Sequence, residues 1–523
     1  MAEHQKKPSS GLYRNLVSYL GGLVMLGAGA LILLSMLAEF SIEKPGPYIG
    51  IIAYLILPGI LGVGGVMVLW GMRREAVRRK RTGEFKALPY PVLDLNDDAS
   101  RKRFGYGLVI GSLFLVLLAW AGYNGFVFTE SVSFCGTTCH TVMEPEHTAY
   151  LYSPHARVRC VDCHVGEGAN WYVKSKLSGV RQVFAVVFHT YETPIPTPIS
   201  NLRPARETCE HCHWPRKFWG ARLLQLPHFR YDEKNSPEQI SLMLKVGGGE
   251  TIRGEGGIHW HMVINNQVTF AATDKQLQHI PWIKIKHADG SEVEFVDQDT
   301  KLTPDQIKAL PKHDMDCMDC HNRPSHQFPA PEGGVDDAIY SGKMSITLPW
   351  IKKVAVDALT RGYPDRDSAH AGMRQEITDF YKNKYPDIAQ QRQADIDKAI
   401  EAAITLYDRS VFPQMKVDWK TYPMNVGHRN WPGCFRCHDG KHVSTDGQVV
   451  PMKCDGTCHS MPQRSQLAGL GQVGAEPTSD WHPWEMPAKG ISVKAHERLL
   501  CSECHSAGYR PKRDCNDCHA TKN

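Results

Sequence analysis

The chain has 523 residues, which is longer than a typical single domain, so two to four structural units are expected. Hydrophobic residues make up 42% and charged residues 22%, which excludes both wholesale disorder and a protein embedded entirely in a membrane. Residues 1–128 contain 14 Lys and Arg against 8 Asp and Glu, whereas the remaining residues, 129–523, are close to neutral. A nucleic-acid-binding protein carries its basic patch on the folded domain, and this distribution excludes that class.

Three long stretches near the N-terminus contain no charged residue. They cover 16–37, 47–72 and 104–128, and each exceeds the roughly 20 residues that a helix needs to cross a bilayer. The first is also longer than the apolar core of about 7–15 residues in a signal peptide. We therefore predict a membrane anchor of three transmembrane helices over residues 1–128. The alternative is a set of buried core helices.

Basic residues between the second and third stretches predict the orientation. The 73–103 loop holds ten Lys and Arg, whereas the loop between the first two stretches has Lys44 as its only base. By the positive-inside rule, the N-terminus and the 73–103 loop lie in the cytoplasm, and everything after Phe128 lies on the outer side of the membrane. The rival interpretation of this loop is a patch that binds a partner or nucleic acid.

All sixteen cysteines fall into eight pairs, and a histidine follows the second cysteine of each pair. Six pairs are separated by two residues and two pairs by three. The eight motifs are Cys135/Cys139/His140, Cys160/Cys163/His164, Cys209/Cys212/His213, Cys317/Cys320/His321, Cys434/Cys437/His438, Cys454/Cys458/His459, Cys501/Cys504/His505 and Cys515/Cys518/His519.

The C-x-x-C-H pattern is typical of covalent c-type haem attachment. The two thiols form thioethers with the porphyrin, and the adjacent imidazole becomes the proximal ligand of the iron. Zinc ribbons and disulfides also use paired cysteines, but neither requires a histidine after each second cysteine. The sequence therefore predicts eight covalently bound c-type haems.

Eight irons call for up to eight further axial ligands, and the chain has enough histidines to supply them. The candidate distal ligands near motifs are His147, His155, His189, His313, His326, His428, His442 and His496. His259 and His261 alternate in G-I-H-W-H and are expected on one face of a strand. Met143 follows His140 by three residues, so it is either an axial ligand of the first haem or a packing residue.

The haem-attachment motifs are distributed unevenly over the rest of the chain, and this distribution suggests its division into domains. Residues 129–215 carry three motifs and residues 311–523 carry five, with little sheet expected around stacked haems. The 216–310 segment reads as a small β-rich insert, with strands at 263–270, 280–286 and 292–296 and a turn at 288–291. Residues 347–410 show helical spacing at 348–359, 375–384 and 393–407. The expected fold is a membrane-anchored multihaem cytochrome c, with a mainly α and irregular periplasmic domain.

Three stretches of sequence resemble a known family. F-C-G-T-T-C-H-T-V-M-E-P at 134–145, Y-S-P-H-A-R-V-R-C-V-D-C-H at 152–164 and C-E-H-C-H at 209–213 are similar to the NapC/NirT family of membrane-anchored, quinol-oxidising cytochromes c. The later I-H-W-H, C-M-D-C-H-N-R-P-S-H and G-C-F-R-C-H-D-G-K-H resemble its larger members, the inner-membrane cytochromes of metal-respiring bacteria. Simpler members have one spanning helix, four haems and a shorter first motif.

The resemblance implies a quinol pocket with a lysine and a carboxylate on the helix after the second haem. Lys174 and Lys176, with Gln182, match this position, but no Asp or Glu lies between Gly168 and Tyr191. Glu144, Glu146 or Glu192 is the candidate replacement carboxylate. The alternative is that both lysines are solvated or pair with haem propionates.

These observations predict a quinol-oxidising cytochrome that passes electrons from the membrane quinone pool to periplasmic c-type cytochromes. By resemblance, the pathway serves anaerobic respiration of an extracellular or metal acceptor, and a homo-oligomer is compatible with it. The alternative is a terminal periplasmic reductase of a small oxyanion or nitrogen compound, which needs one iron with an open distal position. A third possibility is a scaffold that docks a separate reductase.

Overall fold

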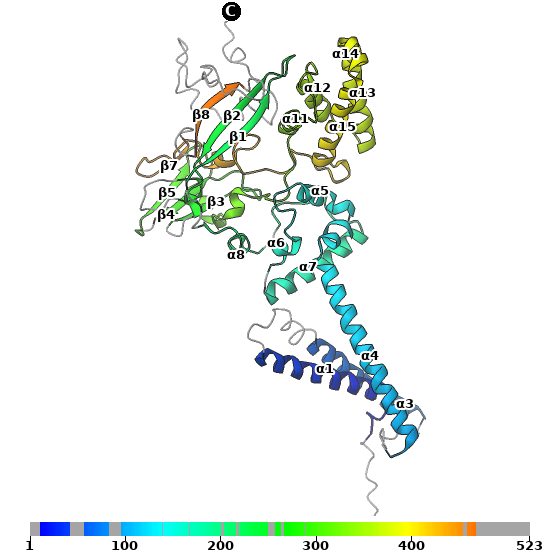
Figure 1. Ribbon diagram of the computed structural model, residues 1–523. Coiled ribbons are helices and arrows are strands. Elements are labelled where there is room, and N and C mark those ends of the chain that lie inside the picture. Colours follow the sequence, from blue (N-terminus) through cyan, green and yellow to red (C-terminus); the bar gives the residue numbers. More distant parts are fainter. Residues whose placement is uncertain are drawn as a thin grey trace, which may run out of the picture. The chain divides into compact units, whose positions relative to one another are not determined.

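The computed structural model describes residues 11–41, 57–82, 96–452 and 458–466, with short gaps at 139, 167, 200–202, 216–217, 219, 249–256, 263–265 and 288. The chain forms two compact units (Figure 1). The first combines Met1–Glu130 with Val165–Val180, and the second combines Ser131–His164 with Arg181–Asn523.

The first unit contains three long helices, α1 (Leu16–Ser41), α3 (Leu57–Thr82) and α4 (Asp98–Thr129), and the first part of α7 (Ala169–Val187). Helices α1 and α3 run antiparallel and approach closely at glycines. A Cβ atom on Gly21 would lie 2.7 Å from the carbonyl oxygen of Gly64, so only glycine fits there. Helix α4 begins where the Asp97 side chain accepts a hydrogen bond from the Ser100 amide.

The three long apolar stretches of the sequence overlap these helices. Among the residues that the structure describes, no helix combines the length and the apolar character needed to cross a membrane.

In the second unit, short helices carry the N-terminal motifs and a helical lobe follows later in the chain. The motif helices are η2 (Phe134–Thr138), α5 (His140–Leu151), α6 (Cys160–His164) and α8 (Ala205–Cys209), and later α10 (Cys317–Cys320) and η6 (Gly433–Arg436). The remaining helices are η4 (Ile258–Met262), α9 (Pro304–Ala309), α11 (Pro331–Tyr340), α12 (Ile351–Thr360), α13 (Arg366–Lys384), α14 (Pro386–Gln391), α15 (Gln393–Ser410) and η5 (Pro413–Met415).

Two antiparallel sheets follow the N-terminal motif helices. One has the order β1-β2-β8 and the other β6-β3-β4-β5-β7. The strands are β1 (Arg222–Phe229), β2 (Pro237–Leu244), β3 (Gln267–Ala271), β4 (Trp282–Lys286), β5 (Glu292–Asp297), β6 (Lys312–Asp314), β7 (His442–Ser444) and β8 (His459–Gln466).

The expected strands at 280–286 and 292–296 correspond to β4 and β5, and the turn between them has Gly290 at φ 85°. The described residues outside the insert contain little sheet, as expected, but the strands that do occur there join those of the insert. Strands β6, β7 and β8 come from the later, motif-bearing part of the chain and complete both sheets. The backbone groups at the edges of the inserted strands find their partners there.

The G-I-H-W-H segment is a 3-10 helix, η4, and not the strand that its alternation suggested. Gly257 allows the tight approach that starts it, because a Cβ there would lie 2.2 Å from the Gly247 carbonyl oxygen. The Ile258 amide then donates to the Lys245 carbonyl at 2.7 Å. Local backbone contacts that are invisible to a period-2 pattern therefore decide this element.

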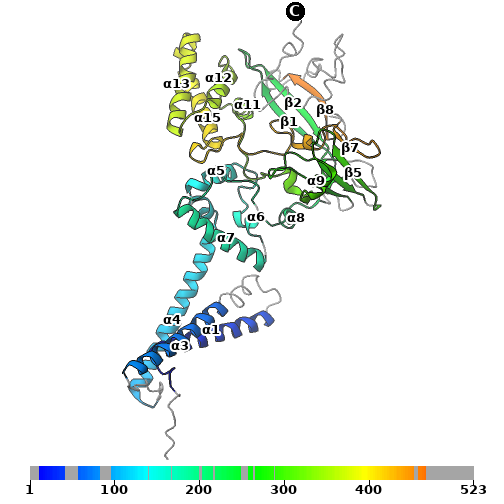
Figure 2. The same ribbon diagram turned by 180° about the vertical axis from the view of Figure 1, so that it is seen from behind.

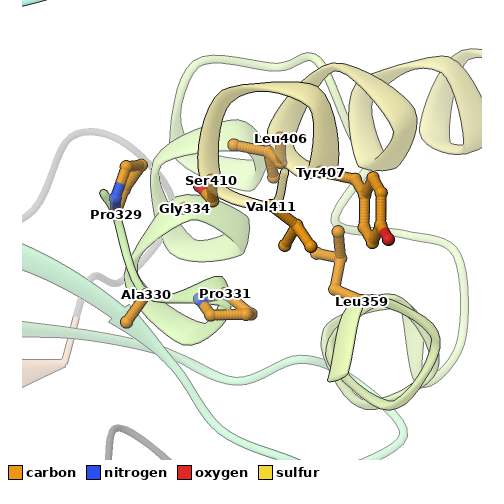
Figure 3. A pocket seen from close by; sticks show the side chains of 9 residues that line it. All are labelled: Pro329, Ala330, Pro331, Gly334, Leu359, Leu406, Tyr407, Ser410 and Val411. Atoms are coloured by element: carbon orange, nitrogen blue, oxygen red, sulfur yellow. The ribbon is translucent and has the colours of Figure 1, made fainter. Parts of the chain in front are cut away.

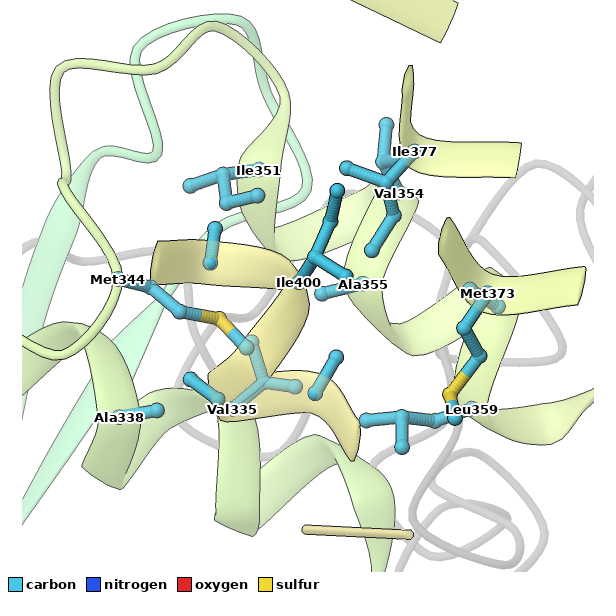
Figure 4. Packing of buried hydrophobic residues seen from close by; sticks show 14 of the residues in the cluster. Val335, Ala338, Met344, Ile351, Val354, Ala355, Leu359, Met373, Ile377 and Ile400 are labelled. Atoms are coloured by element: carbon cyan, nitrogen blue, oxygen red, sulfur yellow. The ribbon is translucent and has the colours of Figure 1, made fainter. Parts of the chain in front are cut away.

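The helical lobe of α11 to α15 forms a bundle with a well-packed core (Figures 2 and 4). The expected helices correspond to α12, α13 and α15, although α13 begins nine residues earlier than its pattern because Asp365 caps it. Met344, Ile351, Met373, Ile377 and Ile400 are fully buried. A cavity of about 10 Å³ between α11, α12 and α15 has room for no more than one water molecule (Figure 3).

Candidate functional site

Each of the best-described haem motifs lies on a single tight helical turn. The histidine amide donates to the carbonyl of the first cysteine in the motifs of His213 and His321, both at 2.8 Å, and in that of His438 at 3.0 Å. One such turn places both thiols and the imidazole within reach of a single porphyrin. At the fourth motif, Asp316 and Asp319 cap this turn reciprocally.

Five of the motif histidines face a second histidine from elsewhere in the chain. The separations of the ring centres are 6.1 Å for His164–His326, 6.1 Å for His213–His155, 6.3 Å for His321–His259, 5.8 Å for His438–His261 and 6.1 Å for His459–His428. All ten residues were candidate ligands from the sequence, but their pairing was not predictable from it.

These separations fit the haem that the motifs imply. An imidazole nitrogen binds a metal at about 2 Å, and its ring centre lies about 1.1 Å further out, so two ligands on opposite sides of one iron have centres roughly 6 Å apart. The interplanar angles range from 9° for His259–His321 to 87° for His261–His438, which direct stacking of the rings does not explain. The two imidazoles of each pair would therefore be able to hold one haem iron between them.

Burial keeps several of these imidazoles in the neutral form that binds a metal. It is the main cause that lowers the pKa of His164, and the nearby His326 lowers it further. Burial likewise lowers the pKa of His261, His321, His326, His428 and His438. A neutral ring has a free lone pair to donate to iron.

The motif thiols are arranged as a series from the first site to the fifth. The thiols of Cys135 and Cys160 are hydrogen-bonded, and so are those of Cys209 and Cys317. Burial is the main cause that raises the pKa of the Cys163 thiol, and Cys212 lies close enough to raise it further. Burial is also the main cause that raises the pKa of the Cys320 thiol, and Cys434 acts on it in the same way. Consecutive motifs therefore adjoin one another in space.

The sixth motif is described only at its end, at Cys458 and His459. Cys458 is half-buried and precedes β8, and its carbonyl oxygen accepts a hydrogen bond from the Lys245 amide at 2.9 Å. The strand that starts at His459 pairs with Leu244 of β2. Cys454, the predicted thioether partner of Cys458, lies outside the described residues, so haem attachment through Cys458 stays a prediction.

The first site lies beside His147. A Cβ atom on Gly136 would fall 2.3 Å from the His147 ring, so the ring packs directly on the first motif. Met143 lies one turn earlier on the same helix, α5. Both candidate ligands are thus on the helix that starts at His140.

One candidate distal histidine has a structural role instead. His442 is 1% exposed; its Nδ1 is 2.9 Å from Asp439 Oδ1, and its Nε2 is 2.7 Å from the Ile280 carbonyl oxygen. Although burial alone lowers the pKa of His442, the hydrogen bond with Asp439 raises it overall. With both nitrogens engaged, His442 has none left for iron.

Two further candidates are exposed and stand apart from the five pairs. His313 lies in β6 beside Phe270, and His189 has a left-handed backbone with its ring near Tyr191. The other predicted ligands and attachment residues without a described side chain are Cys139, His140, Cys454, His496, Cys501, Cys504, His505, Cys515, Cys518 and His519.

The candidate quinol lysines lie on α7, as expected, and the carboxylate partner is one that sequence reasoning missed. Lys176 Nζ is 2.5 Å from Glu130 Oε1, and the Glu130 side chain is 8% exposed. The ammonium of Lys176 also lies 4.9 Å from the centre of the Tyr172 ring, which contacts Phe126. Glu130 lies two residues after the end of the third uncharged stretch at Phe128. This position next to the predicted membrane helix could have identified it as a candidate carboxylate.

The other members of the predicted pocket have different surroundings. Lys174 lies over the Trp171 ring at 4.7 Å, and Gln182 lies two turns further along α7. Glu144 pairs with Arg366 at 2.8 Å.

Comparisons with known proteins agree with this chemistry. Residues 98–196 match the NapC/NirT cytochrome c family, N-terminal region. The chain is 41% identical to "Cytochrome c-type protein ImcH" of Geobacter sulfurreducens over 502 residues, which cover 96% of this chain and 97% of that protein. It is also 31% identical to a "Putative tetraheme cytochrome-c type" protein of Allochromatium vinosum, over 18% of this chain and 55% of that protein. No solved structure matches.

The likeness to ImcH extends over nearly the whole chain and includes the motif-rich C-terminal part, whereas the family match covers α4, the first two motifs and α7. Proteins of this kind are multihaem cytochromes c of the membrane that carry covalently bound haem and transfer electrons. The chain belongs to the NapC/NirT cytochrome c family.

Proposed function

We propose that this protein is an inner-membrane quinol-oxidising cytochrome that passes electrons from the quinone pool, through eight c-type haems, to periplasmic electron carriers. The observation that carries the proposal is the set of five histidine pairs, each with ring centres about 6 Å apart. A bound haem supplies one-electron redox chemistry, and the chain's part is to hold, space and tune it.

The closeness of consecutive motifs in space supports a path for electron transfer from one haem to the next. The first five motifs adjoin one another through the thiols of consecutive sites, and His428 with His459 continues the set to the sixth. If each of the five histidine pairs holds one iron, none of these irons would have a position free for a small substrate. This favours electron transfer over the alternative of a terminal reductase.

Lys176 and Glu130 are the proposed quinol-binding pair. Oxidation of a quinol releases two electrons and two protons, so the site needs a group that binds the hydroxyl and a base that accepts its proton. The Lys176 ammonium can donate to a quinol oxygen while the mostly buried Glu130 carboxylate accepts the proton. Tyr172 and Phe126 supply aromatic surface for the ring beside the pair.

Three membrane-spanning helices with a cytoplasmic N-terminus and a periplasmic haem domain remain part of the proposal. The basic residues of 73–103 support this orientation. The side chains of Leu108, Val116 and Trp120 on α4 are more than half exposed, and a lipid surface would cover them.

Substitution of the proposed pair tests the quinol site. Lys176→Met and Glu130→Gln should each slow reduction of the haems by a quinol analogue in membranes by about 10²-fold, the lower bound for losing a positioned acid or base. Arg181→Ala, which removes an exposed cation from the same helix, should leave the rate unchanged. Rates at the wild-type level in both pair variants, with haem content intact, would reject this site.

A further inference from the structure

The distal imidazoles differ in what their second ring nitrogen contacts. Nδ1 of His259 lies 2.7 Å from the Val246 carbonyl oxygen, and Nδ1 of His261 lies 2.9 Å from that of Ile258. The buried Nδ1 atoms of His155 and His428 have no hydrogen-bond partner among the described residues. His326, which faces His164, is different because a carboxylate lies beside it.

Glu146 provides this carboxylate. Nδ1 of His326 donates to the Glu146 carbonyl oxygen at 3.0 Å and is 3.2 Å from Glu146 Oε2. The Glu146 side chain is 16% exposed, so little water screens its charge from the imidazole. No other distal histidine of the five pairs has an ion-pair contact in the described part of the chain.

Arg323 fixes this carboxylate in place. Its Nη2 atom lies 3.0 and 2.9 Å from the two carboxylate oxygens of Glu146, and its Nε donates to the His326 carbonyl oxygen at 2.6 Å. The guanidinium also stacks on Tyr422 at 4.2 Å from the ring centre. One residue therefore holds both the ligand and its carboxylate partner at fixed positions.

A carboxylate beside a metal-bound imidazole raises the basicity of that ligand. A more basic ligand, together with a nearby negative charge, stabilises the ferric state more than the ferrous state. Arg323 opposes this effect but does not cancel it, because the Glu146 carboxylate lies 3.2 Å from the imidazole Nδ1, whereas Nε of Arg323 donates to the backbone carbonyl oxygen of His326. The net effect is a lower reduction potential at this site.

We propose that Glu146 is a positioning residue that tunes His326, so that the haem of the second motif has a lower potential than those whose distal histidines contact only backbone carbonyls. The proposal rests on the proposed function, because it requires His164 and His326 to bind the same iron. The second motif adjoins the first through Cys135 and Cys160, so this low potential lies near the beginning of the series.

Glu146→Gln tests the proposal, since it removes the charge and keeps the shape. Potentiometric titration of the full, haem-loaded protein, followed by visible and EPR spectra, should show one haem whose reduction equilibrium shifts about tenfold towards the ferrous state, or about 59 mV upward. Arg323→Gln should shift the same haem downward, because it leaves the carboxylate unopposed. General loosening of the site would move both variants in the same direction.

The matched control is Glu144→Gln. It removes the same charge two residues earlier on α5, but Glu144 pairs with Arg366 and its side chain is 37% exposed, so water screens it. This variant should leave the potential of the second-motif haem unchanged. Glu146→Asp retains the charge and should restore most of the wild-type potential.

His326→Met separates failure of the tuning from failure of the ligation. If it changes the EPR signal of one low-spin haem while Glu146→Gln moves no potential, the tuning proposal is overturned and the ligation stands. If His326→Met leaves every low-spin signal unchanged, the pairing itself is wrong. Upward shifts in both Glu146→Gln and Arg323→Gln would also overturn the proposal.

Discussion

The motif-bearing segment 131–215 and the helical lobe of α11 to α15 are built differently. In the lobe, each long helix buries an apolar stripe, and residues such as Ile351, Met373 and Ile400 are fully enclosed. The motif segment has only a few buried apolar residues, among them Val142 and Val161, whereas Leu151 and Phe184 are more than half exposed. The lobe obtains its core from side chains, and under the proposed function the faces of bound porphyrins would supply buried apolar area in the motif segment.

Preventing haem attachment should have the largest effect, because it should unfold the motif segment and leave the lobe folded. Without haem, the motif segment loses the surfaces that its short helices pack against, while the lobe keeps its own core. Limited proteolysis of the apo protein should leave a resistant fragment around 331–411 and degrade residues 131–215. Equal resistance in both regions would show that the motif segment folds without haem.

The buried ion pair between α11 and α12 offers the next largest effect. Lys352 is fully buried, and its Nζ is 2.6 Å from both Asp336 Oδ1 and the Glu332 carbonyl oxygen. Lys352→Met leaves the Asp336 charge without its cation and should lower the free energy of unfolding of the lobe by about 3–5 kcal/mol.

Chemical denaturation followed by far-UV circular dichroism measures this change. The haem absorption spectrum should remain that of the wild type, because the pair lies in the lobe. The double variant Lys352→Met with Asp336→Leu should recover part of the loss. A shifted haem spectrum in the single variant would mean that the lobe and the haem sites do not behave independently.

Alkaline pH should also destabilise the lobe. Burial raises the pKa of Tyr407 to about 12 and also raises the pKa of Tyr381, whose hydroxyl donates to the Pro349 carbonyl. The pKa of Tyr407 in the folded state exceeds its unfolded value near 10. The contribution of this neutral hydroxyl to the free energy of unfolding is therefore fully present below pH 10 and is lost as the pH rises towards 12.

Tyr407→Phe removes one of these groups. The free energy of unfolding of the variant should therefore fall less steeply with pH than that of the wild type, by about 1.4 kcal/mol for each pH unit between 10 and 12. Thermal unfolding across this pH range is the measurement. An unchanged slope in the variant would contradict the assignment of the transition to Tyr407.

A surface ion pair on the lobe should have the smallest effect. Arg374 and Glu401 join α13 and α15 at 2.5 Å, but both side chains are at least half exposed. Arg374→Ala should therefore change the free energy of unfolding by less than about 1 kcal/mol in denaturant titration. A larger loss would show that exposed pairs, and not only the enclosed core, hold the bundle together.

Features that depend on local sequence patterns could be predicted, whereas features that depend on contacts between distant residues could not. Helical spacing within the lobe and the strands β4 and β5 follow from local patterns, so they were predictable. The histidines and cysteines of the motifs follow from spacing as well. Contacts between distant residues do not, which is why neither the pairing of His164 with His326 nor the role of Glu130 was evident.

His442 and the η4 segment are cases in which a local sequence pattern suggested a structure that tertiary contacts then changed. A histidine near a motif looks like a ligand until the tertiary structure engages both of its nitrogens, here with Asp439 and Ile280. Alternation in 258–262 suggested a strand, but the close approach of Gly247 and Gly257 makes a 3-10 turn.

The intact mass of the purified protein under denaturing conditions tests the central claim most directly, because thioether-bound haem stays attached to the polypeptide. The expected mass is that of the chain plus eight haems, including those held by the two longer motifs, through Cys135 with Cys139 and through Cys454 with Cys458. A mass corresponding to the bare polypeptide, or to six haems, would contradict it.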